Sequence, residues 1–161
     1  MMQLTMPKDI KSIVIASHNE GKVREIRSLL DPYGYKIISA KKLGINEPIE
    51  NGMTFSENSL IKSRNAAKKS GLVALADDSG LCVNSLNYRP GIYSARWAGN
   101  NKDFSIAMKK IQKLMEKNDL LSKHNRRAFF VCSLSVYFPD GKNKVFNGRV
   151  NGHLQFPPKG L

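Results

Sequence analysis

Residues 12–30 read SIVIASHNEGKVREIRSLL, and this stretch decides the fold class. It opens with a β-branched apolar run from Ser12 to Ser17, which is typical of a buried strand. A short polar loop follows at once, and apolar residues then recur at helical spacing from Val23 to Leu30. The stretch therefore predicts a strand, a tight loop and a helix in immediate succession.

The rest of the chain predicts further strands and helices around this unit. Asp31-Pro32 ends the first helix, and the pair Thr54 and Glu57 forms a capping-box pattern at the start of another. The turn chemistry of residues 139–141 joins two strands as antiparallel partners, so the sheet is expected to be mixed. The predicted elements are a strand at 35–39, a helix at 55–69, a short strand at 73–76, a helix at 104–115, and strands at 128–138 and 144–150.

Composition predicts one basic globular domain over residues 1–161. The chain has 161 residues, 41% of them hydrophobic, and 26 lysines and arginines against 13 acidic residues give a net charge of +13. Such a surface attracts polyanions, which include nucleic acid, nucleotides and acidic lipid. No signal peptide and no apolar stretch of membrane-spanning length is visible, so a soluble, cytoplasmic protein is expected.

Cysteines and histidines do not suggest a metal site. Cys82 and Cys132 lie in apolar stretches without a CxxC spacing, which predicts two reduced core thiols. His18, His124 and His153 have neither metal-ligand nor triad spacing and are expected on the surface or in loops.

The loop at residues 17–22 is the first candidate for chemistry. It consists of Ser17, His18, Asn19, Glu20, Gly21 and Lys22. Backbone amides at a helix start bind anions, and Lys22 adds a positive charge. The loop is not a Walker A motif, because the first glycine is missing and the lysine precedes Val23. A solvated polar loop is the alternative.

Two further groups of polar residues could carry chemistry. Asp77-Asp78-Ser79-Gly80 follows an apolar strand, where strand-end carboxylates could bind a hard cation, although an ordinary Asx turn fits the spacing too. Adjacent carboxylates in a strand point to opposite faces, so at most one would aim into a given cleft. The segments 47–50 and 62–64 bring Glu50 and Lys62, which could equally be solvated side chains.

Four ordered blocks resemble the inosine triphosphate pyrophosphatase family, also called Ham1-like. They are IVIASHNEGKVREIRSLL (13–30), TFSENSLIKSRNAAKKSG (54–71), ALADDSGLCVNSL (74–86) and PGIYSARWAG (90–99). The resemblance implies an α/β fold with a long mixed twisted sheet flanked by helices, in two lobes with a central cleft. It also implies a homodimer and Mg²⁺-dependent hydrolysis of ITP, dITP and XTP to monophosphate and pyrophosphate.

The resemblance assigns roles to matching residues. Those implied to bind substrate are Ser17, His18, Asn19, Glu20, Gly21, Lys22 and Ser79. Those implied in catalysis are Asp78, Asp77, Lys22 and Lys62, and those implied to hold Mg²⁺ are Glu50 and Asp78. Asp78 would also accept the proton of the attacking water. Charge neutralisation is the main need of attack at a phosphorus atom surrounded by anionic oxygens, and this set supplies it.

One departure from the family pattern concerns the end of the chain. The family continues into a Phe-Gly-Tyr-Asp block and a Ser-His-Arg block that grasp the purine base, whereas this sequence stops at FPPKGL. Weak base selectivity and an exposed apolar surface or sheet edge are the expected consequences. A catalytically silent nucleotide-binding remnant is the alternative function.

A basic nucleic-acid-binding protein is the third hypothesis, prompted by the charge. Such a protein needs aromatic residues interleaved with cations on an exposed platform. Trp97, Phe104, Phe129 and Phe130 lie instead in apolar runs or in the family blocks. Nucleic acid is therefore not expected as a partner.

Overall fold

The computed structural model describes residues 11–159, which form two compact units. The first unit comprises residues 11–52, 56–77 and 134–146. The second comprises 53–55, 78–133 and 147–159. The chain passes from one unit to the other between Asp77 and Asp78. Within residues 11–159, no helix is long and apolar enough to cross a membrane.

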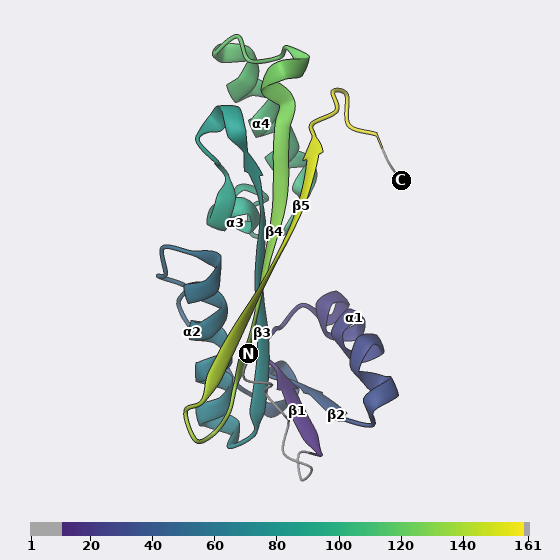
Figure 1. Cartoon of the computed structure of the whole chain (residues 1–161), viewed down its shortest axis with the longest axis vertical. Helices are drawn as coiled ribbons and strands as arrows, with labels where there is room; N and C mark the ends of the chain where they lie inside the picture. Colours follow the sequence, from purple (N-terminus) through teal and green to yellow (C-terminus); the bar gives the residue numbers. More distant parts are fainter. Residues whose placement is uncertain (1–10, 160–161) are drawn as a thin grey trace, which may run out of the picture. The chain divides into compact units, whose positions relative to one another are not determined.

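A five-stranded mixed sheet has the order β2-β1-β3-β4-β5 (Figure 1). The strands are β1 (Ser12–Ile15), β2 (Lys36–Ser39), β3 (Val73–Val83), β4 (Arg127–Tyr137) and β5 (Asn143–His153). β1 pairs in parallel with both β2 and β3, with Val14 opposite Ile38 and Ala74. A short turn joins β4 to β5, and a connection this short makes the pair antiparallel. The α/β class and the mixed sheet predicted from the sequence are confirmed.

The helices are α1 (Glu20–Leu30), α2 (Phe55–Ser70), α3 (Ser94–Trp97) and α4 (Phe104–Lys117). α2 and α4 match the predicted helices to within one or two residues, and α1 begins at Glu20, three residues before the predicted apolar spacing. The single turn of α3 was not predicted, because four residues are too short to show a helical period.

The core of the first unit has two sides, separated by the sheet. Ile13 and Ile15 face α1 and pack on its Val23, whereas Val14 and Ala74 belong to the cluster that packs on α2. Successive side chains of a strand point to opposite faces, so β1 and β3 each serve both clusters. α1 and α2 therefore cover opposite faces of the parallel strands (Figure 1).

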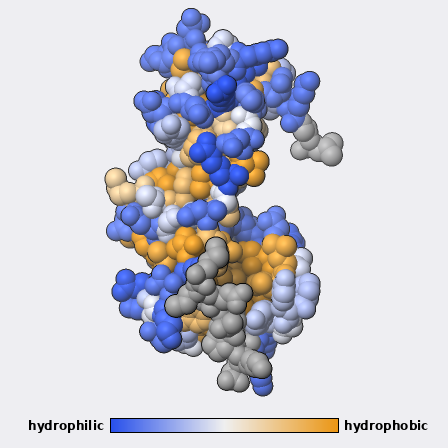
Figure 2. Space-filling model, in the orientation of Figure 1, coloured by the Kyte–Doolittle hydropathy of each residue, from blue (hydrophilic) through white to orange (hydrophobic). Residues whose placement is uncertain are grey.

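The second unit has its own apolar core. Val83, Ile111 and Met115 are buried there, the last two on one face of α4. On the side of the molecule drawn in Figure 2, the surface around α4 and the loop after it is largely hydrophilic, as expected for an amphipathic helix. Asp103 caps α4, its Oδ1 accepting from the Ser105 amide at 2.9 Å. Hydrogen bonding by the Ser105 side chain, and secondly by this amide, holds the pKa of the Asp103 carboxyl below its ordinary value.

Two sequence predictions need correction. The strand predicted to end at Ala76 continues to Val83, because Leu81, Cys82 and Val83 resume the apolar alternation beyond the polar segment. The segment from Asp77 to Gly80 is therefore strand and not a turn. Cys132 is exposed rather than a core thiol, because other residues of β4 occupy the buried positions of that strand. Cys82 is buried, as predicted.

Candidate active site

The loop before α1 is built around Asn19, the N-cap of that helix. Asn19 Oδ1 accepts from the Gly21 amide at 2.9 Å and from the Lys22 amide at 3.4 Å. The Asn19 amide in turn donates to Ser17 Oγ at 3.1 Å. These bonds fix the loop at the positive end of the helix dipole. Because Asn19 already accepts from the Gly21 and Lys22 amides, these two groups are not left to bind an anion.

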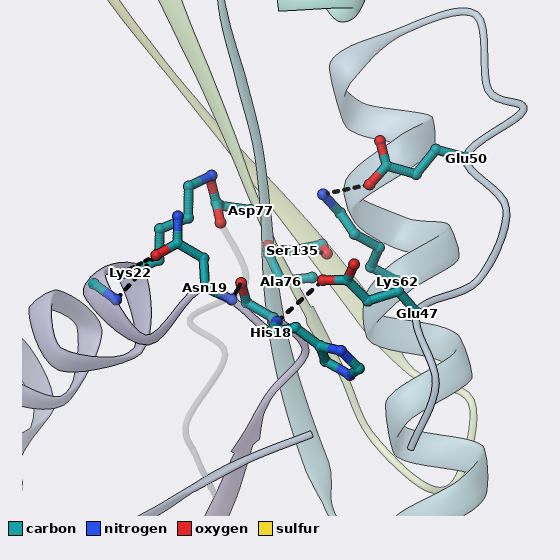
Figure 3. A network of polar contacts seen from close by, with 11 residues as sticks. His18, Asn19, Lys22, Glu47, Glu50, Lys62, Ala76, Asp77 and Ser135 are labelled. Atoms are coloured by element: carbon teal, nitrogen blue, oxygen red, sulfur yellow. Dashed lines mark hydrogen bonds and ion pairs between the residues drawn. The ribbon is translucent and has the colours of Figure 1, made fainter. Parts of the chain in front are cut away.

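Lys22 pairs with Asp77 across the first unit. Lys22 Nζ lies 2.5 Å from Asp77 Oδ2, and the side chains are 38% and 12% exposed (Figure 3). The alternation of β3 places Asp77 on the face of Leu75, which packs in the α1 cluster. A charge-assisted hydrogen bond therefore holds the lysine of the loop against the central strand.

A second lysine, on α2, pairs with a second carboxylate in the loop before that helix. Lys62 Nζ lies 3.0 Å from Glu50 Oε1, and Lys62 is the more buried partner, with 11% of its side chain exposed against 32%. Figure 3 shows Lys62 rising from α2 toward Glu50 in the preceding loop. The predicted site residues thus form two lysine–carboxylate pairs, one for each helix.

The loop from 45 to 52 is fixed to α2 at two more points. Asn65 Nδ2 donates to the Asn46 carbonyl at 3.0 Å, and the Gly52 amide donates to Asn58 Oδ1 at 2.9 Å. A Cβ atom at Gly52 would meet that Asn58 oxygen at 2.6 Å and Glu57 Cβ at 2.8 Å. Only glycine allows so close an approach of the loop to the helix.

His18 lies in a loop, as predicted, and it is half-buried and hydrogen-bonded there. Its Nε2 lies 2.8 Å from the Ile45 carbonyl oxygen, and its backbone amide donates to Glu47 Oε1 at 3.0 Å. His124 and His153 are exposed, as predicted. The sequence does not single out Glu47 within the segment 47–50, because it gives no sign of a contact across 29 positions.

Ser135 was missed entirely by sequence reasoning. Its Oγ donates to Ser63 Oγ on α2 at 2.8 Å and lies 3.4 Å from the Ala76 carbonyl, next to Asp77 in β3. Both hydroxyls are fully buried. The bond to Ser63 ties α2, the helix that carries Lys62, to β4, and the Ala76 contact joins β4 to β3, the strand that carries Asp77. A single serine in a strand gives no pattern by which to find it.

The remaining predicted residues are less closely joined to these pairs. Glu20 is exposed on the first turn of α1. Asp78 and Ser79 belong to the second unit; Asp78 is buried, and the alternation of β3 turns it away from the side on which Asp77 lies. The pairing of Glu50 with Asp78 at one metal stays a prediction.

The donor chemistry fits magnesium better than a transition metal. Among residues 11–159, no three His, Cys, Asp or Glu side chains form a cluster that could hold a metal by themselves. Mg²⁺ commonly takes one or two carboxylates and completes its shell with water and phosphate oxygens. Carboxylates such as Glu50 therefore suit Mg²⁺ bound together with a polyphosphate.

Comparison with known proteins shows which family this chain is similar to. The model of the Ham1 family matches residues 13–161. The dITP/XTP pyrophosphatase of Zymomonas mobilis is 54% identical over 149 residues, which cover 92% of this chain and 70% of the relative. The dITP/XTP pyrophosphatase of Rhodopseudomonas palustris is 49% identical over the same shares of the two chains.

Solved structures agree with the sequence matches. The HAM1 protein from Coxiella burnetii superposes with a TM-score of 0.83 at 35% identity, covering 92% of this chain and 75% of the other. The dITP/XTP pyrophosphatase from Mycobacterium abscessus gives a TM-score of 0.79 at 33% identity, covering 92% and 77%.

Proposed function

This chain belongs to the Ham1 family, and we propose that it is an Mg²⁺-dependent pyrophosphatase that hydrolyses dITP, XTP and ITP to the monophosphate and pyrophosphate. The family resemblance predicted from four sequence blocks is confirmed. Relatives named dITP/XTP pyrophosphatase share about half of their residues with this chain over 92% of its length. The observation that carries the proposal is the pair of ammonium groups, Lys22 and Lys62, each held beside a carboxylate.

Those two pairs suit a ligand that brings both signs of charge. A magnesium–triphosphate complex offers anionic oxygens to the lysines and a cation to the carboxylates, so each partner can exchange one strong contact for another. Ser17 and Asn19 add a hydroxyl and an amide donor at the start of α1. The triphosphate tail is therefore proposed to lie against Lys22, Lys62 and this loop.

We propose that Glu50 and Asp78 hold the metal and that Asp78 accepts a proton from the attacking water. When bound, Mg²⁺ supplies charge neutralisation at the phosphates. Asp78 is buried, which suits a carboxylate that must act away from bulk solvent. Asp77, fixed by Lys22, is proposed to orient the water or the cation, and Ser79 to contact the substrate. No covalent intermediate is needed.

The larger assembly is part of the same proposal. We propose the two-lobed arrangement with a central cleft and the homodimer on the strength of the family resemblance alone. Sedimentation velocity on the purified protein checks the dimer directly: a single species of twice the 18.0 kDa chain mass is expected, and a monomer at all concentrations would contradict it.

The substrate panel tests the activity. Release of pyrophosphate and of the matching monophosphate is expected from dITP, XTP and ITP with Mg²⁺, and none in excess EDTA. Phosphate release in place of pyrophosphate would mean that a different bond is cut. Binding of dITP without turnover would favour the alternative of a silent nucleotide-binding protein, and comparison with dGTP measures the base selectivity.

A further inference from the structure

The two lysine–carboxylate pairs of the first unit start on opposite faces of the sheet. Lys22 stands on α1 and Lys62 on α2, and these helices pack on the two different apolar clusters. A single triphosphate can engage both only if the loop before α1 and the loop before α2 keep a fixed mutual position. Some contact between these two loops must therefore set that position.

Two hydrogen bonds link the loops, and both involve His18. The His18 amide donates to Glu47 Oε1 at 3.0 Å (Figure 3). His18 Nε2 lies 2.8 Å from the Ile45 carbonyl oxygen. A carbonyl oxygen only accepts, so Nε2 carries the hydrogen. We call these two bonds the His18–Glu47 clasp. One bond uses the backbone of the first loop and the other the backbone of the second, so the clasp is reciprocal.

The second loop is held to α2 immediately beside the clasp. The Asn46 carbonyl accepts from Asn65 of α2, while the next residue, Glu47, accepts from the loop of α1. Ile45 is buried in the α2 cluster, and its amide donates to the Ala40 carbonyl at 3.0 Å. Residues 45–47 therefore form a hydrogen-bonded bridge between α2 and the loop before α1.

We propose that His18 and Glu47 are positioning residues for polyphosphate binding, which hold the Lys22 and Lys62 sides of the site in register. This inference rests on the proposed function for the identity of the ligand. Glu47 serves as a hydrogen-bond acceptor and not as a metal ligand, and His18 serves as a donor through Nε2. Each role is preserved by glutamine, which can accept through Oε1 and donate through Nε2.

The measurement is calorimetric binding of inorganic tripolyphosphate with Mg²⁺, because this probe has no base and is independent of turnover. His18→Ala and Glu47→Ala are each expected to weaken binding about three- to tenfold, the effect of one lost hydrogen bond. His18→Gln and Glu47→Gln are expected to stay within about twofold of wild type, which is less than the loss of one such bond. Glu25→Ala on α1 and His124→Ala are matched controls at exposed positions and should bind like wild type.

A second readout separates positioning from general destabilisation. Glu47→Ala should speed hydrogen exchange of the His18 amide, whereas Glu47→Gln should keep it protected. For dITP turnover, the alanine variants should raise KM and lower kcat together, and the glutamine variants should restore both. A loss of thermal stability with unchanged tripolyphosphate binding would overturn the proposal.

Other results overturn it in ways distinct from failure of the proposed function. If Glu47→Gln is as damaging as Glu47→Ala, Glu47 acts through its charge and the positioning role is wrong. If His18→Gln fails to restore binding, the Nε2 contact is not the cause. Wild type that binds tripolyphosphate without hydrolysing dITP would sink the function and leave the clasp standing, whereas normal turnover with insensitive alanine variants would do the reverse. Wild type that neither binds nor hydrolyses overturns both.

Discussion

The two units of the chain present their cations differently. In the first unit Lys22 and Lys62 lie against carboxylates at 2.5 and 3.0 Å. In the second, the Arg149 guanidinium lies 3.5 Å from the centre of the Phe129 ring and Lys110 Nζ lies 4.3 Å from that of Trp97. A cation over a ring has no anionic partner to exchange, while a lysine beside a carboxylate can trade it for a phosphate as the carboxylate takes a metal.

The cavities of the two units also differ, in their volume and in the residues that line them. The second unit contains a hollow of about 520 Å³ whose walls are mostly apolar, formed by residues such as Phe104, Met108 and Phe130. In the first unit the hollow beside Glu47 and Lys62 measures only about 10 Å³, close to the space of one water. The difference indicates that the polyphosphate binding proposed for the first unit would depend on placed charges and not on an enclosed pocket.

The largest expected effect comes from the two aspartates at the boundary between the units. Asp78→Asn should lower kcat for dITP by about 10²–10⁴-fold, as loss of a general base does. Asp77→Asn should cost less, because Asp77, paired with Lys22, is proposed only to orient the water or the cation and not to accept the proton. Steady-state pyrophosphate release measures both. Equal rates for Asp78→Asn and wild type would reject the proposed metal and proton roles of Asp78.

The lysines of the first unit should come next. Lys22→Met and Lys62→Met should each lower kcat/KM for dITP about 10- to 100-fold, the loss of one charge-assisted contact to phosphate. Lys69→Met, at an exposed position of the same helix as Lys62, is the matched control and should change little. If Lys110→Met in the second unit reduced turnover as much as Lys62→Met, the contrast between the units would fail.

Glycine substitutions should separate tight from open backbone positions. Gly52→Ala places a methyl group 2.6 Å from Asn58 Oδ1 and should destabilise the protein by about 1–3 kcal/mol through overpacking. Gly148→Ala meets nothing nearer than the Cys132 carbonyl at 3.9 Å and should change stability by less than about 0.5 kcal/mol. Chemical denaturation measures both values, and similar values for the two variants would contradict the described position of the loop on α2.

The smallest expected effect is that of alkylating the cysteines of the second unit, which should leave dITP turnover unchanged. Burial raises the pKa of the Cys82 thiol, although Arg149 partly opposes this, so the reactive thiolate is scarce near pH 8. Cys132 is exposed. Iodoacetamide followed by mass spectrometry should label Cys132 first, and rates should rise with pH as thiolate forms. Faster labelling of Cys82 would show that the core around it is open.

Local sequence patterns predicted much of this fold. The structure has the strand at Ser12, the helix after it and the turn at residues 139–141 within a few positions of where the sequence predicts them. Such short-range signals do not depend on distant contacts. The continuation of β3 through Asp77 to Gly80 was missed because polar residues with glycine resemble a turn. Tertiary packing, which the sequence does not reveal, distinguishes strand from turn in this segment. A Cβ atom at Gly80 would meet Ser94 Oγ at 2.6 Å, so the strand lies tightly against its neighbours.

Charge and the family blocks single out Lys22, Lys62, Glu50 and Asp77, and the first unit joins these residues as two lysine–carboxylate pairs. Their roles in binding and catalysis stay a proposal. The contacts of His18, Glu47 and Ser135 could not be foreseen, because each links segments far apart in the sequence through ordinary polar groups. Only the tertiary fold makes these residues neighbours.

Binding of Mn²⁺ in place of Mg²⁺, followed by electron paramagnetic resonance with tripolyphosphate present, tests most directly whether carboxylates and lysines share one metal–polyphosphate complex. Wild type should bind one Mn²⁺ per chain, and Glu50→Gln, Asp78→Asn and Lys62→Met should each weaken that binding by about tenfold or more. Equal Mn²⁺ binding by wild type and both carboxylate variants would contradict the account.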